Sequence, residues 1–145
     1  MSVPDLILIP LLFVLGSAFG SFLNVVIYRV PKKMSIISPG SHCFSCKAPI
    51  RVLDNIPVLG YFLLNGRCRS CNESFPSRYA FVELITALLT ICIYIIYGAG
   101  QAFLIYLALT YLLIAITFVD IDHFIIPNGF VLLGLGMLVA SLYFD

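Results

Sequence analysis

Long apolar stretches separated by polar segments run along the chain. Each of three uninterrupted stretches is close to the length of about 20 helical residues that crosses a bilayer: residues 5–28, 79–97 and 102–119. A fourth stretch, residues 124–144, is broken by Pro127-Asn128-Gly129, and Asn128 is a candidate cap for a helix that begins near Phe130. The pattern predicts an all-α integral membrane protein with about four transmembrane helices.

Composition supports the membrane class. Hydrophobic residues make up 61% of the 145 residues and charged residues only 10%, whereas soluble domains carry about 25% charged residues. A soluble fold would need a core far larger than so short a chain can enclose. The net charge of +1 points to no nucleic-acid partner, so the lipid bilayer is the expected environment.

The cations are confined to one segment. All eight Lys and Arg residues lie between Arg29 and Arg78. Cytoplasmic loops collect positive charge, so residues 29–78 are expected in the cytoplasm and the N-terminus outside. The absence of Lys or Arg before residue 29 also favours a retained helix over a signal peptide.

Four cysteines in this loop have metal-ligand spacing. Two Cys-x-x-Cys pairs flank residues 47–67, and each can form a turn that directs two sulfurs at one ion. The predicted ligands of a tetrahedral site are Cys43, Cys46, Cys68 and Cys71. Zinc is the expected metal, in a zinc-ribbon-like loop between the first two transmembrane helices.

Other readings of the cysteines remain open at this point. Two disulfides are disfavoured by a reducing cytoplasm, a redox pair lacks a thioredoxin-like βαβ pattern, and iron bound by four cysteines has the same sequence signature. His42 is expected at the surface rather than as a further ligand. Cys92 lies within a span and is expected to be an apolar packing residue.

Three acidic residues lie at or near the predicted membrane boundary. Carboxylates there are costly and are functional candidates. Asp120 adjoins Phe118-Val119 and is the preferred candidate, whereas Asp122 is expected to cap the span in interfacial water. Glu83, one turn into the second span, is expected to be a buried partner of a loop arginine such as Arg78.

Small residues mark one side of the first span. Gly16 and Gly20, with Ser17 and Ser21, form a face that allows close helix packing. Asn24 follows on the same helix and is expected to be an interhelical hydrogen-bond donor.

These features resemble, in order, the bacterial type IV prepilin leader peptidase/N-methyltransferase family. Gly20-Ser-Phe-Leu-Asn-Val-Val-Ile-Tyr-Arg-Val-Pro31 is similar to the opening signature of the family. The loop has the family's order of motifs: Cys43-x-x-Cys46, Asp54-Asn-Ile-Pro57, Gly66-Arg-Cys-Arg69, Cys71, Arg78-Tyr79 and Val82-Glu83-Leu84. The segment Asp120-Ile-Asp-His-Phe-Ile-Ile-Pro127-Asn128 is similar to the one with the first catalytic aspartate, and its spacing indicates Asp120.

The resemblance implies a membrane aspartic peptidase of the bacterial inner membrane. Its substrates would be type IV prepilins or pseudopilins, and many members then methylate the new N-terminus with S-adenosylmethionine. The chemistry needs two carboxylates that share one proton, and Asp120 would be one of them. The resemblance divides the chain into a transmembrane helix (1–28), a cytoplasmic zinc-binding loop (29–78), and transmembrane helices 2–4 at the start of an incomplete peptidase domain (79–145).

One element of the family pattern is missing from the sequence. The second catalytic aspartate belongs to a Gly-x-Gly-Asp motif, and Gly134-Leu-Gly136-Met137 has methionine in its place. A helix rises about 1.5 Å per residue, so Asp145 would lie far from the cytoplasmic face. We therefore expect the N-terminal portion of a peptidase. The alternative is a non-catalytic membrane adaptor whose zinc loop binds a cytoplasmic partner or prepilin.

Overall fold

The computed structural model describes residues 3–144, and its regular elements are all helical. They are α1 (Val3–Arg29), the 3-10 helix η1 (Val52–Asn55), α2 (Leu59–Leu63), α3 (Arg78–Tyr97), α4 (Gln101–His123) and α5 (Asn128–Phe144). Three helices, α1, α3 and α4, are long and apolar enough to cross a membrane, and α5 contains a shorter apolar segment, Asn128–Val139. The prediction of an all-α integral membrane fold is confirmed.

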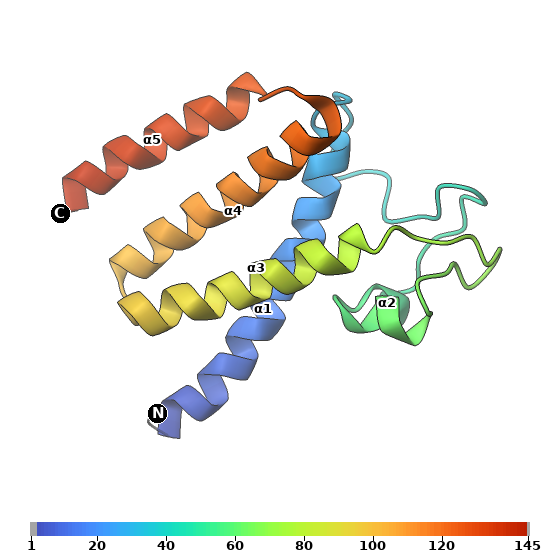
Figure 1. Cartoon of the computed structure of the whole chain (residues 1–145), viewed down its shortest axis with the longest axis horizontal. Helices are drawn as coiled ribbons and strands as arrows, with labels where there is room; N and C mark the ends of the chain where they lie inside the picture. Colours follow the sequence, from blue (N-terminus) through green and yellow to red (C-terminus); the bar gives the residue numbers. More distant parts are fainter. Residues whose placement is uncertain (1–2, 145) are drawn as a thin grey trace.

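The loops gather at the two ends of the helix bundle (Figure 1). Helices α3, α4 and α5 follow one another in alternating directions, and α1 crosses α3. Residues 30–77 and the α4–α5 connection lie toward one end, and the α3–α4 turn lies at the other. At that turn Gly98 has a positive φ of 66° and its N–H donates to the carbonyl of Tyr94, a helix end that glycine adopts at little cost.

Small residues bring α1 and α3 close together, as the sequence predicts. A Cβ atom on Gly16 would lie 2.8 Å from the Cα of Ala87, and one on Gly20 would lie 2.6 Å from the Cα of Glu83. Both distances are shorter than any real Cβ contact, so only glycine permits this approach. The close contact therefore fixes the position of α3 along α1, and with it the position of the end of the cysteine loop, which leads into α3.

Hydrogen bonds satisfy several polar groups along this contact. Asn24 Nδ2 donates to the carbonyl of Tyr79 at 3.0 Å, which confirms the predicted interhelical donor. The buried hydroxyl of Thr90 donates to the carbonyl of Thr86 at 2.8 Å and lies 2.8 Å from the hydroxyl of Tyr111 on α4. Such bonds matter because a bilayer offers no water to an unpaired polar group.

The ends of α4 and α5 differ from the expected boundaries. Helix α4 continues to His123, so Asp120 and Asp122 lie in its last turn and not in a connection. Phe124 then adopts the left-handed conformation (φ 52°) that ends the helix. Helix α5 begins at Asn128, which is therefore its first residue and not a cap for a helix from Phe130. Asp145 lies outside the described residues.

Candidate metal centre and membrane-edge carboxylates

The first cysteine pair forms a tight hydrogen-bonded turn. The N–H of Cys43 donates to the carbonyl of Ala48 at 2.9 Å, and the N–H of Lys47 donates to the carbonyl of Cys43 at 3.0 Å. Lys47 has a positive φ of 60°, which reverses the chain directly after Cys46. The turn thereby directs both sulfurs to the same side.

The second pair repeats this turn position by position. The N–H of Cys68 donates to the carbonyl of Glu73 at 2.8 Å, and the N–H of Asn72 donates to the carbonyl of Cys68 at 2.9 Å. Asn72 has a φ of 57°, matching Lys47 in the first turn. This structural repeat was not predicted, although the identical Cys-x-x-Cys spacing is its signal in the sequence.

The four predicted ligands come together. The sulfurs of Cys43, Cys46, Cys68 and Cys71 all lie within 4.8 Å of one another. The Cys43–Cys71 and Cys46–Cys68 sulfur pairs are 3.7 and 3.9 Å apart. Tetrahedral zinc with bonds of about 2.3 Å requires sulfur separations of roughly 3.8 Å, so the cluster fits such an ion. All four are free cysteines, which argues against the disulfide alternative.

The pKa values of two thiols in the cluster also favour the binding of a metal cation. N–H groups of Cys71 and Ser70 lower the pKa of Cys68 to about 7 and so favour its thiolate. The N–H of Glu73 acts in the same direction on Cys71, but burial and the neighbouring thiols outweigh it and raise the pKa of Cys71 to about 12. Four thiolates this close repel one another, and a divalent metal removes that repulsion.

The other two candidate residues lie outside the cluster. His42 hydrogen-bonds the carbonyl of Gly40 at 2.8 Å and does not belong to the metal-ligand group. Cys92 is exposed on the surface of α3 instead of packing inside the bundle, so that expectation was wrong. A lipid-facing position suits a small apolar side chain equally well.

An ion pair attaches the second cysteine turn to η1. Arg69 donates through Nε to Asp54 Oδ2 at 2.9 Å and through Nη2 to Asp54 Oδ1 at 2.6 Å. This hydrogen-bonded guanidinium lowers the pKa of Asp54 below its ordinary 3.8. The Asp54 side chain is 8% exposed, although that of Arg69 is 55% exposed.

A second ion pair joins α3 to α4. Arg78, the first residue of α3, donates through Nη1 to both carboxylate oxygens of Asp122. The expectation that Asp122 simply caps the span in interfacial water was therefore wrong. The two residues are 44 positions apart in the chain, and only the packing of α3 against α4 reveals the pair.

Asp120 remains unpaired in the same turn of α4. It is exposed, and no hydrogen bond or ion pair of its carboxylate is found within residues 3–144. Residues two apart lie on different faces of a helix, so Asp122 turns toward Arg78 while Asp120 does not. The end of α4, whose last turn contains Asp120, lies at the same end of the bundle as the loop that contains the four cysteines (Figure 1).

Glu83 has a different partner from the expected arginine. Its Oε2 accepts a hydrogen bond from the N–H of Val58 at 2.7 Å, and the Ser21 hydroxyl is a further donor. Arg78 pairs with Asp122 instead, which corrects the prediction. Val58 has a φ of 63°, which is rare for a β-branched residue, and the bond to Glu83 helps to hold it there.

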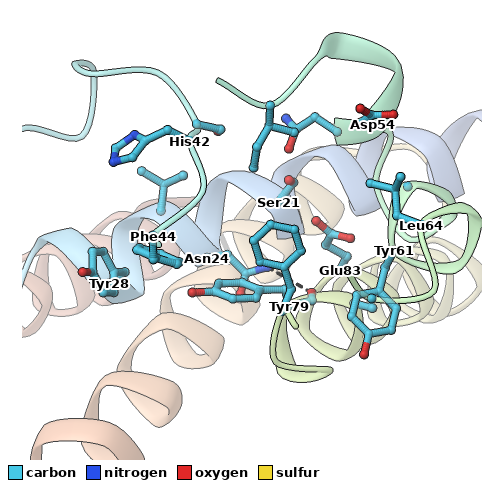
Figure 2. A pocket seen from close by; sticks show the side chains of 18 of the residues that line it. Ser21, Asn24, Tyr28, His42, Phe44, Asp54, Tyr61, Leu64, Tyr79 and Glu83 are labelled. Atoms are coloured by element: carbon cyan, nitrogen blue, oxygen red, sulfur yellow. Dashed lines mark hydrogen bonds between the residues drawn. The ribbon is translucent and has the colours of Figure 1, made fainter. Parts of the chain in front are cut away.

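A cavity of about 260 Å³ lies between the loop and the helices α1 and α3 (Figure 2). Side chains that face it come from all three parts of the chain: Ser21 and Asn24, Phe44 and Tyr61, and Tyr79 and Glu83. The cavity was not predicted, because the residues of its walls lie far apart in the sequence.

Comparison with known proteins places these features in a family. Residues 14–97 match the family described as the bacterial peptidase A24 N-terminal domain. The prepilin leader peptidase/N-methyltransferase of Aeromonas salmonicida is 35% identical over 160 aligned residues, which cover 93% of this chain and 54% of the relative. The enzyme of the same name from Myxococcus xanthus is 41% identical, and the alignment covers 86% of this chain and 37% of that relative. The one from Neisseria gonorrhoeae is 37% identical, and the alignment covers 86% of this chain and 52% of that relative.

The chain spans about half the length of the Aeromonas salmonicida and Neisseria gonorrhoeae relatives and 37% of the Myxococcus xanthus relative. No solved structure matches it. Because the family match covers more than half of the residues, the chain belongs to the prepilin leader peptidase/N-methyltransferase family, to whose N-terminal domain residues 14–97 correspond.

Proposed function

We propose that this protein acts as a prepilin leader peptidase, removing the leader of type IV prepilins or pseudopilins at the cytoplasmic face of the bacterial inner membrane. The N-terminus lies outside, residues 29–78 form the cytoplasmic zinc-binding loop, and residues 79–145 begin the peptidase domain. The observation that carries the proposal is the similarity to enzymes of this name over 86–93% of the chain.

Asp120 is the proposed catalytic carboxylate. It is exposed at the end of α4 and unpaired among the described residues, while Arg78 holds its neighbour Asp122. An aspartic mechanism needs a second carboxylate that shares a proton with the first. We assign that second group to the part of the longer relatives that this chain does not span.

Structural zinc in the four-cysteine cluster completes the proposal. The sulfur separations suit tetrahedral zinc, and the ion would stabilise the folded loop without entering the cleavage chemistry. Methylation of the new N-terminus, with S-adenosylmethionine as methyl donor, is supported by the second half of the relatives' name.

A cleavage assay tests the assignment of Asp120. This chain is reconstituted in lipid with the remaining C-terminal part of the Aeromonas salmonicida relative and a prepilin substrate. We expect cleavage with the natural sequence and a loss of at least about 10²-fold for Asp120→Asn, as for removal of an essential acid–base group. Asp120→Asn with normal cleavage would exclude the proposed role. The chain without the relative's part shows whether the second carboxylate is internal.

A non-catalytic adaptor is the second candidate. Asp54 and Asp122 are both paired with arginines, so Asp120 is the one unpaired aspartate in the described loop and at the end of α4. A single free carboxylate favours the adaptor, because the aspartic mechanism needs two. A zinc-loaded chain that binds prepilin but yields no cleavage in the combined assay would support the adaptor and exclude the peptidase.

A further inference from the structure

The cavity between the loop and helices α1 and α3 is lined at its helical side by hydrogen-bond acceptors. Glu83 and Ser21 lie beside each other there (Figure 2). Asn24 also lines the cavity and is only 5% exposed, and its Oδ1 has no hydrogen-bond partner within the described range. A buried acceptor without a donor is costly, so a donor from a bound molecule would stabilise this wall.

The two nearby arginines are engaged elsewhere. Arg29 lines the cavity, but its guanidinium donates to the carbonyls of Ser35 and Pro39 at 2.9 and 2.7 Å. Arg69 holds Asp54, which also lines the cavity. Lys47 lies at the rim and is exposed. Glu83 is therefore a half-buried carboxylate without an ion-pair partner in the part of the chain that the structure describes.

Aromatic rings form much of the remaining wall. Tyr28 and Phe44 pack with ring centroids 5.0 Å apart at one end, and Tyr61 and Tyr79 lie nearer Glu83 (Figure 2). Aromatic faces attract cations, most strongly where water is excluded. The Lys32 ammonium, 3.4 Å from the centroid of the Tyr28 ring, is an internal example.

We propose that this cavity binds an organic cation, an ammonium or sulfonium group on an apolar or aromatic body, with Glu83 as its counter-ion. The carboxylate balances the charge, the unpaired oxygen of Asn24 accepts a hydrogen bond from a donor on the ligand, and the rings cover the body. The inference rests on the proposed function for its ligand class, because N-methylation requires a sulfonium methyl donor and an amine acceptor.

Binding measurements on the zinc-loaded chain in lipid nanodiscs test the proposal. S-adenosylmethionine is compared with S-adenosylhomocysteine, which lacks the sulfonium charge. Phenylalanine amide is compared with N-acetylphenylalanine amide, which lacks the ammonium. We expect at least one charged probe to bind, and Glu83→Gln to weaken it about tenfold or more, as expected for loss of a desolvated charge partner. Binding of the acetylated probe should not change.

The controls separate charge from structure. The side-chain amide introduced by Glu83→Gln can still accept the Val58 N–H, and normal zinc content would show that the loop of this variant is folded. Glu73→Gln neutralises an exposed side chain that does not line the cavity, and it keeps the backbone groups of residue 73 in the second cysteine turn, so every affinity should stay unchanged. If the Glu83→Gln variant fails to bind zinc, the Phe44→Leu variant is measured in its place. We expect this variant to bind the cation severalfold more weakly, because it lacks one aromatic face.

The two probe pairs identify the source of the cation. Preference for S-adenosylmethionine over its neutral analogue indicates a sulfonium site, and binding of phenylalanine amide indicates an amine site. The proposal is overturned if neither charged probe binds, or if Glu83→Gln and Phe44→Leu both leave binding unchanged. Prepilin cleavage is measured separately, so its failure would remove the proposed function without touching the binding result.

Discussion

At the scale of single residues, two arginine–aspartate pairs connect segments that the sequence separates. Arg69 with Asp54 attaches the second cysteine turn to η1, and Arg78 with Asp122 attaches the start of α3 to the end of α4. Arg69 donates through two nitrogens, Nε and Nη2, a geometry that suits a guanidinium and not an ammonium. Arg78 reaches both oxygens of Asp122 through Nη1 alone. The first pair therefore connects two parts of the loop, and the second connects α3 to α4.

The Asp54 pair predicts a measurable pH dependence. Because Arg69 lowers the pKa of Asp54, the carboxylate contributes stability above the ordinary pKa of 3.8, and this contribution is lost as the pH falls through the lowered pKa. In a ¹³C NMR titration we expect the Asp54 midpoint below 3.8 in the natural sequence and nearer 3.8 in Arg69→Ala. Loop amide signals at each pH show whether the loop is still folded. A midpoint at or above 3.8 in the folded natural loop would contradict the pairing.

At the scale of helices, the α1–α3 contact depends on two glycines. Gly20 lies against the backbone of α3, with Glu83 Cα and Val82 O within 2.6 and 3.1 Å of an added Cβ atom. Backbone cannot move aside as a flexible side chain can. The helices therefore must separate if Gly20 is enlarged, and Glu83, which holds the N–H of Val58, would move with α3.

Substitution of Gly20 by alanine tests this dependence. We expect Gly20→Ala to lower the free energy of unfolding by about 1–3 kcal/mol, the usual cost of overpacking. Gly136→Ala is the matched control, because nothing lies within 4 Å of an added Cβ there. Alanine in that open helical position should be neutral or stabilising by up to about 1 kcal/mol. Unfolding in mixed micelles with increasing sodium dodecyl sulfate measures both; equal losses would refute a specific α1–α3 contact.

At the scale of the whole molecule, the cysteine loop differs in kind from the bundle that carries it. Its regular elements are η1 and α2, with four and five residues, and large apolar side chains such as Ile37 and Val52 are 88% and 86% exposed. So little burial leaves the loop in need of another source of stability. A metal ion bound by both cysteine turns would close the loop and supply that stability.

Metal removal should therefore unfold the loop while the helices persist. We expect one zinc ion per chain by elemental analysis, unchanged in Cys92→Ser and lost in Cys43→Ser. After chelation, trypsin should cut within residues 30–77 at least about ten times faster, because unfolding exposes the Lys and Arg sites there. Iron in the elemental analysis, or digestion that chelation does not accelerate, would contradict a structural zinc site.

Patterns along the chain predicted most of the fold and the metal ligands. Transmembrane helices are set by the length of an apolar stretch, and a four-cysteine site by short spacings, so both are visible locally. The predictions for Asp122 and Glu83 failed for the opposite reason. Several acceptors and donors were available within reach of the loop, and only packing decided that Arg78 binds Asp122 while Val58 donates to Glu83.

The sequence by itself determined an all-helical membrane protein, the approximate extent of each apolar helix, and the four cysteines of the candidate metal centre. Those features follow from hydropathy and ligand chemistry, which act over a few neighbouring residues. Tertiary structure alone decided the two ion pairs and the cavity around Glu83. These depend on how closely α1 approaches α3 and where the loop returns to the bundle, and such distances between remote segments are not encoded in any local pattern.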